Sequence, residues 1–381
     1  MTHIYADWAA TSPLHPAARA SLLGWLDSPV PANPSSLHTW GMDASDRLAA
    51  ARVSLAEAFG WDGEITFTSG GTESDGLAVY ALVQRFRNTP RRRIVLSPLE
   101  HPAVREAVYA FGPSAGFAVE ECAVLPEGTV DLSDFAARMG EDLAFCAVMA
   151  VQNETGVIQP TEELASLAHA CGALFLSDAV QAAGHIPLPQ AADMVTVSAH
   201  KFGGPAGVGA VLHRGTLLPL LKGGGQERGL RGGTENVTGI CAMAAAAAEV
   251  REPDWMAALR NGLEASFLRR MHTAGVPVTA AGQHRIGSVS CFVFGGGEQF
   301  PTGENLVLSC DMAGLALSAG SACHSGTGAP SSALLSMGFS PSEAVRSVRL
   351  SFGWGTEEAE MVRAYGILED VIRKMVCSGK R

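Results

Sequence analysis

The chain has 381 residues, of which 47% are hydrophobic and 17% are charged, and its formal net charge is −11. This composition excludes a disordered or coiled-coil protein, and the negative charge argues against electrostatic binding of nucleic acid or of an anionic membrane. No run of residues approaches the roughly 18 apolar residues of a transmembrane helix, so we expect no membrane span.

From residue 17 to residue 249 the sequence alternates helical stretches with short apolar runs. This alternation is typical of βαβ units and predicts a mostly parallel sheet with helices on both faces. The predicted strands are residues 64–68, 94–97, 143–151, 174–177 and 194–198, and the predicted helices are residues 47–59, 73–86, 102–111 and 162–170.

The character of the sequence changes near residues 252–254. Strands and helices are mixed from there on, which predicts a smaller α+β domain. Its expected elements are helices 255–274, 304–317 and 357–376, strands 277–280, 286–294 and 347–352, and a Gly- and Ser-rich loop at 318–328. We therefore expect a large α/β domain over residues 16–253, and a small domain built from residues 1–15 and 254–381.

Three predicted strands lead into polar residues of different kinds, namely Asn153, Asp178 and Lys201. They are 25 and 23 residues apart, about one βαβ unit each, so they should converge on one crevice at the carboxyl edge of the sheet. An amide, a carboxylate and an amine together suit pyridoxal phosphate (PLP): the amine binds the cofactor, the carboxylate keeps the ring nitrogen protonated, and the amide donates to the ring hydroxyl.

A phosphate cradle is predicted where Ser69-Gly70-Gly71-Thr72 joins a strand to a helix, because free N–H groups and the positive end of the helix dipole meet there. An ordinary βα turn would look the same, and a strand-terminal Asp such as Asp178 is also a common helix cap. The amine has few other candidates, since the remaining lysines are Lys222, Lys374 and Lys380.

The eight cysteines contain no CxxC pair, which argues against a zinc knuckle or a redox dithiol. Cys146 and Cys291 lie in apolar runs and are expected to be buried. Cys323 instead lies in a loop of small residues, which makes it a candidate nucleophile. The first seven residues have neither a basic region nor an apolar stretch, so we expect no signal peptide and a reducing, cytoplasmic setting.

A series of motifs, in the same order along nearly the whole chain, resembles the cysteine desulfurases of the NifS/IscS type, within the class V aminotransferase-like PLP enzymes. The resemblance implies PLP-dependent fold type I, with a mostly parallel seven-stranded sheet in the large domain. The motifs are ANPSSLHTWG (32–41), TSGGTES (68–74), LEHPAV (99–104), QNETGVIQP (152–160), SDAVQAAG (177–184), SAHKFGGPAGVG (198–209), GGGQERGLRGGTEN (223–236) and SAGSACHSG (318–326).

The resemblance also implies roles for individual residues. Lys201 resembles the Schiff-base lysine, Cys323 the nucleophile that takes the sulfur, and His101 the histidine that stacks on the ring and assists proton transfer. Asp178 is similar to the partner of the ring nitrogen. The remaining implied contacts are those of the ring hydroxyl (Asn153 and Gln181), of the phosphate (Gly71, Thr72, Ser198, His200 and, across a dimer interface, Thr234) and of the substrate carboxylate (Arg349 and Asn33). No metal site is expected.

The implied reaction converts L-cysteine to L-alanine and leaves a persulfide on Cys323, with Lys201 as the base for the Cα proton. The implied partners are a second copy of the chain and a sulfur-acceptor protein, with no direct contact to nucleic acid or a membrane. An iron–sulfur scaffold is one such acceptor, and Cys323 is then also a candidate to bridge to a cluster there; tRNA thiolation and DNA modification stay open as destinations of the sulfur.

Two alternatives stay open from the sequence. The first is a related class V PLP enzyme, such as a selenocysteine lyase or an aminotransferase, although Cys323 in its loop disfavours the aminotransferase. The second is a non-catalytic scaffold with a PLP fold, against which the presence of Lys201, Asp178, His101 and Cys323 argues. His324 follows the candidate nucleophile and has no role that the sequence can assign.

Overall fold

The core of the protein is a seven-stranded sheet, and the computed structural model describes residues 3–28, 30, 32–297, 300–320 and 329–378. Every neighbouring pair in the sheet is parallel except those that involve β8, which runs against both of its neighbours. The prediction of an α/β fold with a mostly parallel sheet is therefore confirmed. The strand order is β2 (Glu64–Thr68), β8 (Gly209–His213), β7 (Met194–Ser198), β6 (Leu174–Asp178), β5 (Leu143–Ala147), β3 (Arg93–Leu96) and β4 (Ala118–Glu121).

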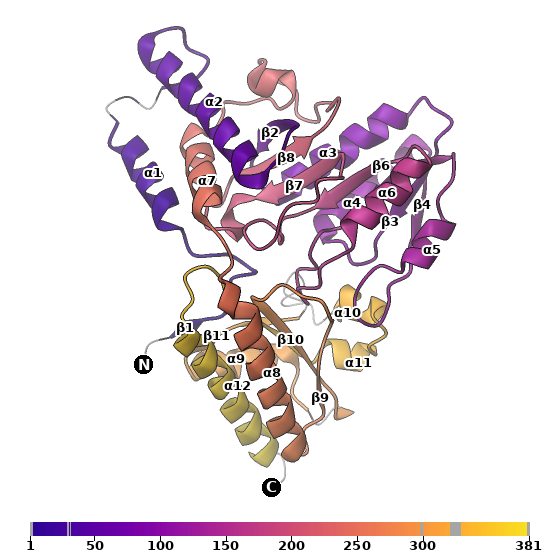
Figure 1. Ribbon diagram of the computed structural model, residues 1–381, viewed down its shortest axis with the longest axis vertical. Coiled ribbons are helices and arrows are strands. Elements are labelled where there is room, and N and C mark those ends of the chain that lie inside the picture. The colour runs from indigo at the N-terminus through magenta and orange to yellow at the C-terminus, as the bar shows by residue number, and fades with distance from the viewer. Residues whose placement is uncertain (1–2, 29, 31, 298–299, 321–328, 379–381) are drawn as a thin grey trace.

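Helices cover both faces of this sheet, which is why its central strands are apolar on both sides (Figure 1). Along β5, Cys146 belongs to the apolar cluster on one face and Phe145 to the cluster on the other. Helices α1 and α2 both pack against α7, and the alanine run of α7 allows this close approach. The covering helices are α1 (Pro16–Leu26), α2 (Thr39–Phe59), α3 (Gly71–Phe86), α4 (Pro102–Phe111), α5 (Leu132–Ala137), α6 (Thr161–Ala170) and α7 (Val237–Glu249).

A second, antiparallel sheet lies below the first in Figure 1, and both ends of the described chain are on this side. Its strands pack on long helices through a core that includes Phe267, Phe292 and Tyr365. The strand order is β12 (Ser318–Ala319), β13 (Ser347–Ser351), β10 (Val289–Phe294) and β9 (Val278–Ala280), and the helices are α8 (Asp254–Thr273), α9 (Gly303–Met312), α10 (Ser332–Ser336), α11 (Pro341–Ala344) and α12 (Glu358–Ser378).

The expected helix over residues 304–317 is wrong at its C-terminal end. Helix α9 ends at Met312, and Gly314 follows with a φ of 89°, a left-handed conformation that stops a helix. The next residues form β11 (Leu315–Ala316), which pairs in parallel with β1 (Ile4–Tyr5) at the other end of the chain. Because the two strands are so far apart in the sequence, no local sequence pattern predicts that they pair.

Other boundaries also differ from the sequence analysis. Helix α2 begins at Thr39, eight residues before the expected start, because the side chain of His38 caps it by accepting from the backbone N–H of Gly41. Strand β5 ends at Ala147 rather than at residue 151, and neither β4 nor β8 was expected. The domain boundaries at residues 15/16 and 253/254 stay a prediction. Within the described ranges, no helix combines the length and the apolar character needed to cross a membrane.

Candidate active site

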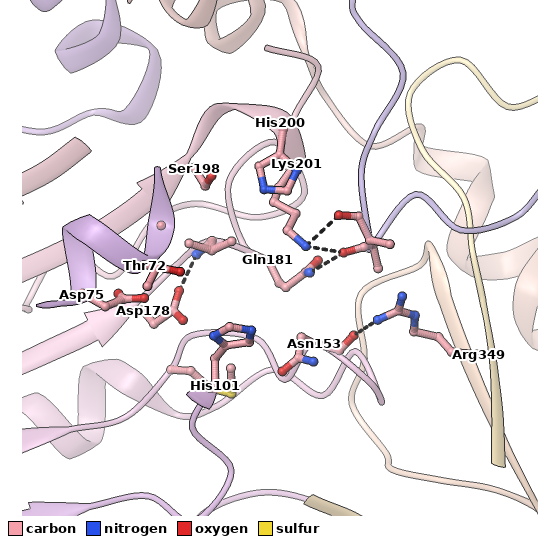
Figure 2. Close-up of a pocket in the computed structure, with 15 residues that line it drawn as sticks. Thr72, Asp75, His101, Asn153, Asp178, Gln181, Ser198, His200, Lys201 and Arg349 are labelled. Atoms are coloured by element: carbon pink, nitrogen blue, oxygen red, sulfur yellow. Dashed lines mark hydrogen bonds between the residues drawn. The ribbon is translucent and has the colours of Figure 1, made fainter. Parts of the chain in front are cut away.

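A cavity of about 310 Å³ opens at the carboxyl edge of the seven-stranded sheet, where residues that follow β2, β3, β5, β6 and β7 meet Arg349 of β13 (Figure 2). This is the edge at which open α/β sheets bind ligands. The predicted site residues that line the cavity are Gly71, Thr72, His101, Asn153, Asp178, Gln181, Ser198, His200, Lys201 and Arg349.

Lys201 is held at one side of the cavity by the N-terminal segment of the chain. It ends the short 3-10 turn Ala199–Lys201 directly after β7. Its Nζ donates to the carbonyl oxygens of Ala9 at 2.7 Å and of Ala10 at 3.0 Å, and Nε2 of Gln181 also donates to the Ala9 carbonyl at 2.8 Å. These bonds hold the amine against Ala9 and Ala10, which also line the cavity.

Three carboxyl groups are buried together at the sheet end of the cavity. Asp178, at the end of β6, is 5% exposed and accepts from the N–H of Val180 at 2.8 Å, and burial raises its pKa. Burial and the charge of Asp178 raise the pKa of Asp75 and of Glu100 well above the usual range. Asp75 accepts from Thr196, and Glu100 from the N–H of Met149. This environment favours a positive charge beside Asp178.

His101 enters the cavity from the side opposite Lys201 (Figure 2). It caps α4, because its Nδ1 accepts from the backbone N–H of Ala103 at 3.1 Å. Burial lowers its pKa, and Asp178 opposes this effect. With Nδ1 acting as the acceptor, the neutral ring carries its proton on Nε2.

The predicted phosphate ligands gather at the start of α3. Gly70, which has a φ of 151°, provides no side-chain cap there, so the first N–H groups of the helix are available to an anion. The one acidic residue of the first turn, Glu73, is ion-paired with Arg231 at 2.7 Å. A Cβ on Gly209 would lie 2.6 Å from the carbonyl carbon of Gly70, so a glycine is required behind this turn.

Two polar residues, one at the end of strand β7 and one in the turn after it, complete this side of the cavity. Ser198 is the last residue of β7, and His200 follows it. Burial, with a further contribution from Lys201, lowers the pKa of His200 to about 4. Its imidazole is therefore neutral at physiological pH, and its Nδ1 lies 3.1 Å from the hydroxyl of Thr11.

Arg349 lies at the end of the cavity remote from Asp178 (Figure 2). It is buried in β13, where its Nη1 donates to the backbone carbonyl of Asn153 at 2.7 Å and its Nη2 to Oδ1 of Asp7 at 2.8 Å. The side-chain Oδ1 of Asn153 accepts from Gln152 at 3.3 Å, which orients the amide group.

Not every predicted site residue lies at this cavity in the part of the chain that the structure describes. Asn33 lies in the turn before α2, where its Oδ1 accepts from the N–H of Ser35, and Thr234 is exposed before α7. Neither lines the cavity. Cys323 and His324 lie outside the described residues. The roles suggested for Asn33, Thr234 and Cys323 stay predictions.

Several groups that the structure places in or beside the cavity are not among the predicted site residues, for example Asp7, Asp75 and Glu100. Asp75 looks like an ordinary acidic residue in the first turns of a helix, and only the packing of α3 on the sheet buries it. Glu100 was within a recognised motif, LEHPAV, which was the one available signal. The carbonyl oxygens of Ala9 and Ala10 belong to the backbone, so the residue types in the sequence do not indicate their role.

Known proteins resemble this chain over nearly its whole length. The family model of the class-V aminotransferases matches residues 4–363. A protein of Cereibacter sphaeroides named cysteine desulfurase is 37% identical over 98% of this chain and 97% of its own length.

Solved structures agree with this match. A NifS-like protein has a TM-score of 0.85 at 28% identity, covering 97% of this chain and 99% of its own. A structure of SspA in complex with cysteine has a TM-score of 0.77 at 26% identity, covering 92% and 98%. On this evidence the chain belongs to the aminotransferase class-V family.

Proposed function

We propose that this protein is a PLP-dependent cysteine desulfurase, a sulfurtransferase that converts L-cysteine to L-alanine and supplies the sulfur for iron–sulfur clusters or other thio-cofactors. The observation that carries the proposal is the single cavity into which the amine of Lys201, the carboxylate of Asp178 and the guanidinium of Arg349 all open. The family membership and the cysteine desulfurase relative support the same activity.

The residues around the cavity fit PLP. Its volume of about 310 Å³ is within the range of small-molecule sites, about 300–1,000 Å³. The uncapped start of α3 suits a phosphate, and the buried carboxyl cluster around Asp178 suits a protonated ring nitrogen. Gln181 and the amide of Asn153 would hold the ring hydroxyl. Bound in this cavity, PLP supplies an electron sink that weakens the bonds at the Cα of an amino acid.

The chain's own residues then have separate roles in the proposed reaction. Arg349 binds the carboxylate of L-cysteine through its planar fork of N–H groups, and Asn33 assists it. Lys201 takes the proton from Cα, and His101, with a proton on Nε2, assists proton transfer on the opposite side. The Cys323 thiolate attacks the substrate sulfur: the S–S bond forms as the C–S bond breaks, and the electron pair left on carbon takes up a proton to give alanine.

A homodimer is part of the proposal, with Thr234 of the partner subunit completing the phosphate site. Thr234 is exposed here, as a residue that serves a neighbouring subunit has to be. The loop between α1 and α2 and the start of α2 expose large apolar side chains, including Leu37 at 94%, Trp40 and Met42. Such a patch is typical of a protein interface.

The cellular setting and the acceptor are also proposed. The described cysteines are Cys122, Cys146, Cys171, Cys241, Cys291 and Cys310, and all are free, which supports a reducing cytoplasm. The acceptor is a protein that receives the persulfide sulfur from Cys323, such as an iron–sulfur scaffold.

The experiment that tests the function is turnover of L-cysteine by the PLP-loaded protein. With a thiol reductant present, the protein should release sulfide and L-alanine in equal amounts. Formation of pyruvate in place of alanine, or the absence of both products, would contradict the proposal.

A further inference from the structure

The guanidinium of Arg349 is held from two directions by groups of the chain itself. The side chain is 2% exposed, and its two terminal nitrogens donate to groups from different parts of the chain: Nη1 to the Asn153 carbonyl at 2.7 Å and Nη2 to Oδ1 of Asp7 at 2.8 Å. Two fixed acceptors determine the plane of a planar group. The remaining N–H groups of Arg349 are left for a ligand, and its buried Nε has no hydrogen-bond partner within the described structure.

Asp7 is itself fixed from several sides. Its Oδ1 also accepts from the hydroxyl of Ser318 at 2.8 Å, and Ser318 is the register partner of Arg349 between β12 and β13. The backbone of Asp7 forms a bridge with Ser351 two residues further along β13, and the N–H of Ala9 donates to the Ser351 hydroxyl. The Asp7 carboxylate is therefore positioned by the same strand that carries Arg349.

A carboxylate at this place would not be expected if attraction for the substrate were the only requirement. The substrate carboxylate is negative, and Asp7 adds a second negative charge on the same guanidinium, which opposes binding by simple electrostatics. The geometry offers another advantage, because a buried arginine that is already oriented loses less freedom when the ligand binds.

We propose that Asp7 is a positioning residue for substrate recognition: it holds the guanidinium of Arg349 in the plane in which the free N–H groups receive the α-carboxylate of the amino acid. This inference rests on the proposed function, since it takes Arg349 as the carboxylate clamp. Asp7 acts through Arg349, and it belongs to the N-terminal segment that also carries the carbonyls bound to Lys201.

Loss of Asp7 leaves Arg349 an alternative partner. Glu154 follows Asn153 in the chain, and its Oε2 is buried without a hydrogen-bond partner in the described structure. The charge of Arg349 acts on the Glu154 carboxyl. In an Asp7→Ala variant we expect Arg349 to lose its fixed plane and to be free to turn toward Glu154.

The test compares two ligands that differ only in the carboxylate. L-Alanine, the proposed product, and ethylamine both present an amine to the PLP-loaded protein, and their binding is measured from the change in cofactor absorbance. In Asp7→Ala, the affinity for L-alanine should fall at least tenfold, whereas the affinity for ethylamine should stay within twofold of wild type. Asp7→Asn keeps an oxygen that can accept from Arg349 and Ser318, so it should bind L-alanine at least as tightly as wild type.

The controls separate this inference from a general loss of structure and from the proposed function. Asp62→Ala removes a surface carboxylate from an ion pair with Arg214 and should leave both affinities unchanged. If Asp7→Ala does not fold, Asp7→Ser, which is too short to reach Arg349, is expected to show the same selective loss. Equal weakening of both ligands, no weakening of either, or an Asp7→Asn defect as large as that of Asp7→Ala would overturn the inference. Failure of wild type to release sulfide from cysteine would contradict the proposed function alone.

Discussion

Lys201 and Ala9 are 192 residues apart in the sequence, yet Nζ of Lys201 donates to the carbonyl oxygen of Ala9 at 2.7 Å. The N-terminal segment thus reaches into the cavity and positions the amine on which the proposed chemistry depends. The same segment contains Asp7, which pairs with Arg349, so Lys201 and Arg349 are supported by one segment.

Replacement of Lys201 by alanine should abolish cysteine-dependent sulfide release, because no other described lysine lines the cavity. The long-wavelength absorbance of lysine-bound PLP should also disappear. The matched control is Lys222→Ala, at an exposed position, which should behave as wild type. Borohydride reduction followed by peptide mapping checks the assignment, and a cofactor label on Lys222 would show that it is wrong.

The Cys323→Ser variant should still bind L-cysteine, since Lys201, Asp178 and Arg349 remain. Its rate of alanine formation should fall by at least about 100-fold, because the variant lacks the nucleophile. The assay measures alanine and the cofactor spectrum in one sample. Cys171→Ser, at a half-buried free cysteine, is the control. Near-normal alanine production would remove Cys323 from the mechanism and favour the selenocysteine lyase interpretation.

Alkylation of wild type should reach Cys323 before the buried cysteines. Burial raises the pKa of Cys291 to about 12 and that of Cys146 well above its usual value, so neither forms appreciable thiolate near neutral pH. Mass spectrometry of the protein after brief exposure to iodoacetamide measures the order of labelling. Faster modification of Cys146 or Cys291 than of Cys323 would contradict this prediction.

Asp178→Asn should lower kcat by about 100-fold or more, because an amide cannot stabilise a positive charge on the ring nitrogen as a buried carboxylate does. PLP content should stay near wild type, since the phosphate ligands are untouched. Asp75→Asn is the comparison: it removes a carboxyl that touches Thr196 within the same cluster, and the loss should be smaller. An unchanged kcat in a fully loaded Asp178→Asn protein would rule out the proposed role.

Glu154 should make the stability of the protein depend on pH. Burial raises the pKa of its carboxyl from 4.5 to about 7, although Ser331 and Arg349 oppose the shift. A raised carboxyl pKa favours folding at low pH, and this contribution is lost as pH rises from about 4.5 to about 7. The Glu154→Gln variant has a neutral side chain, like protonated Glu154. The free energy of unfolding of the variant minus that of wild type should therefore increase as the pH rises across that range. At higher pH this difference should stay constant. Denaturant titrations at pH 4.5, 6 and 8 measure the difference, and a constant difference would contradict the prediction.

Trp40→Asp should weaken the proposed dimer, because it places a charge in the exposed apolar patch near the start of α2. Sedimentation velocity at low protein concentration measures the dissociation. PLP affinity should fall with it, since Thr234 of the partner subunit would be withdrawn from the phosphate. Leu308→Asp, at an apolar position on α9 that is also exposed, should leave the dimer intact. A wild-type protein that sediments as a monomer with full activity would refute the dimer.

The sequence by itself determined that the large sheet is mostly parallel, five of its seven strands, and the polar residues that follow three of them. Asn153, Asp178 and Lys201 could be placed at one edge because neighbouring parallel strands end on the same side, and the alternation of apolar runs with helical stretches identified those strands. Local patterns determine such features, since each depends on residues close together in the chain.

Only the tertiary structure decided which groups from distant segments support these residues. The pairing of β1 with β11, the ion pair of Asp7 with Arg349 and the burial of Asp75 and Glu100 beside Asp178 join residues that no local pattern connects. The physical reason is that burial and charge pairing arise when separate segments pack together. The pKa of a carboxyl and the orientation of a guanidinium are therefore properties of the folded cavity.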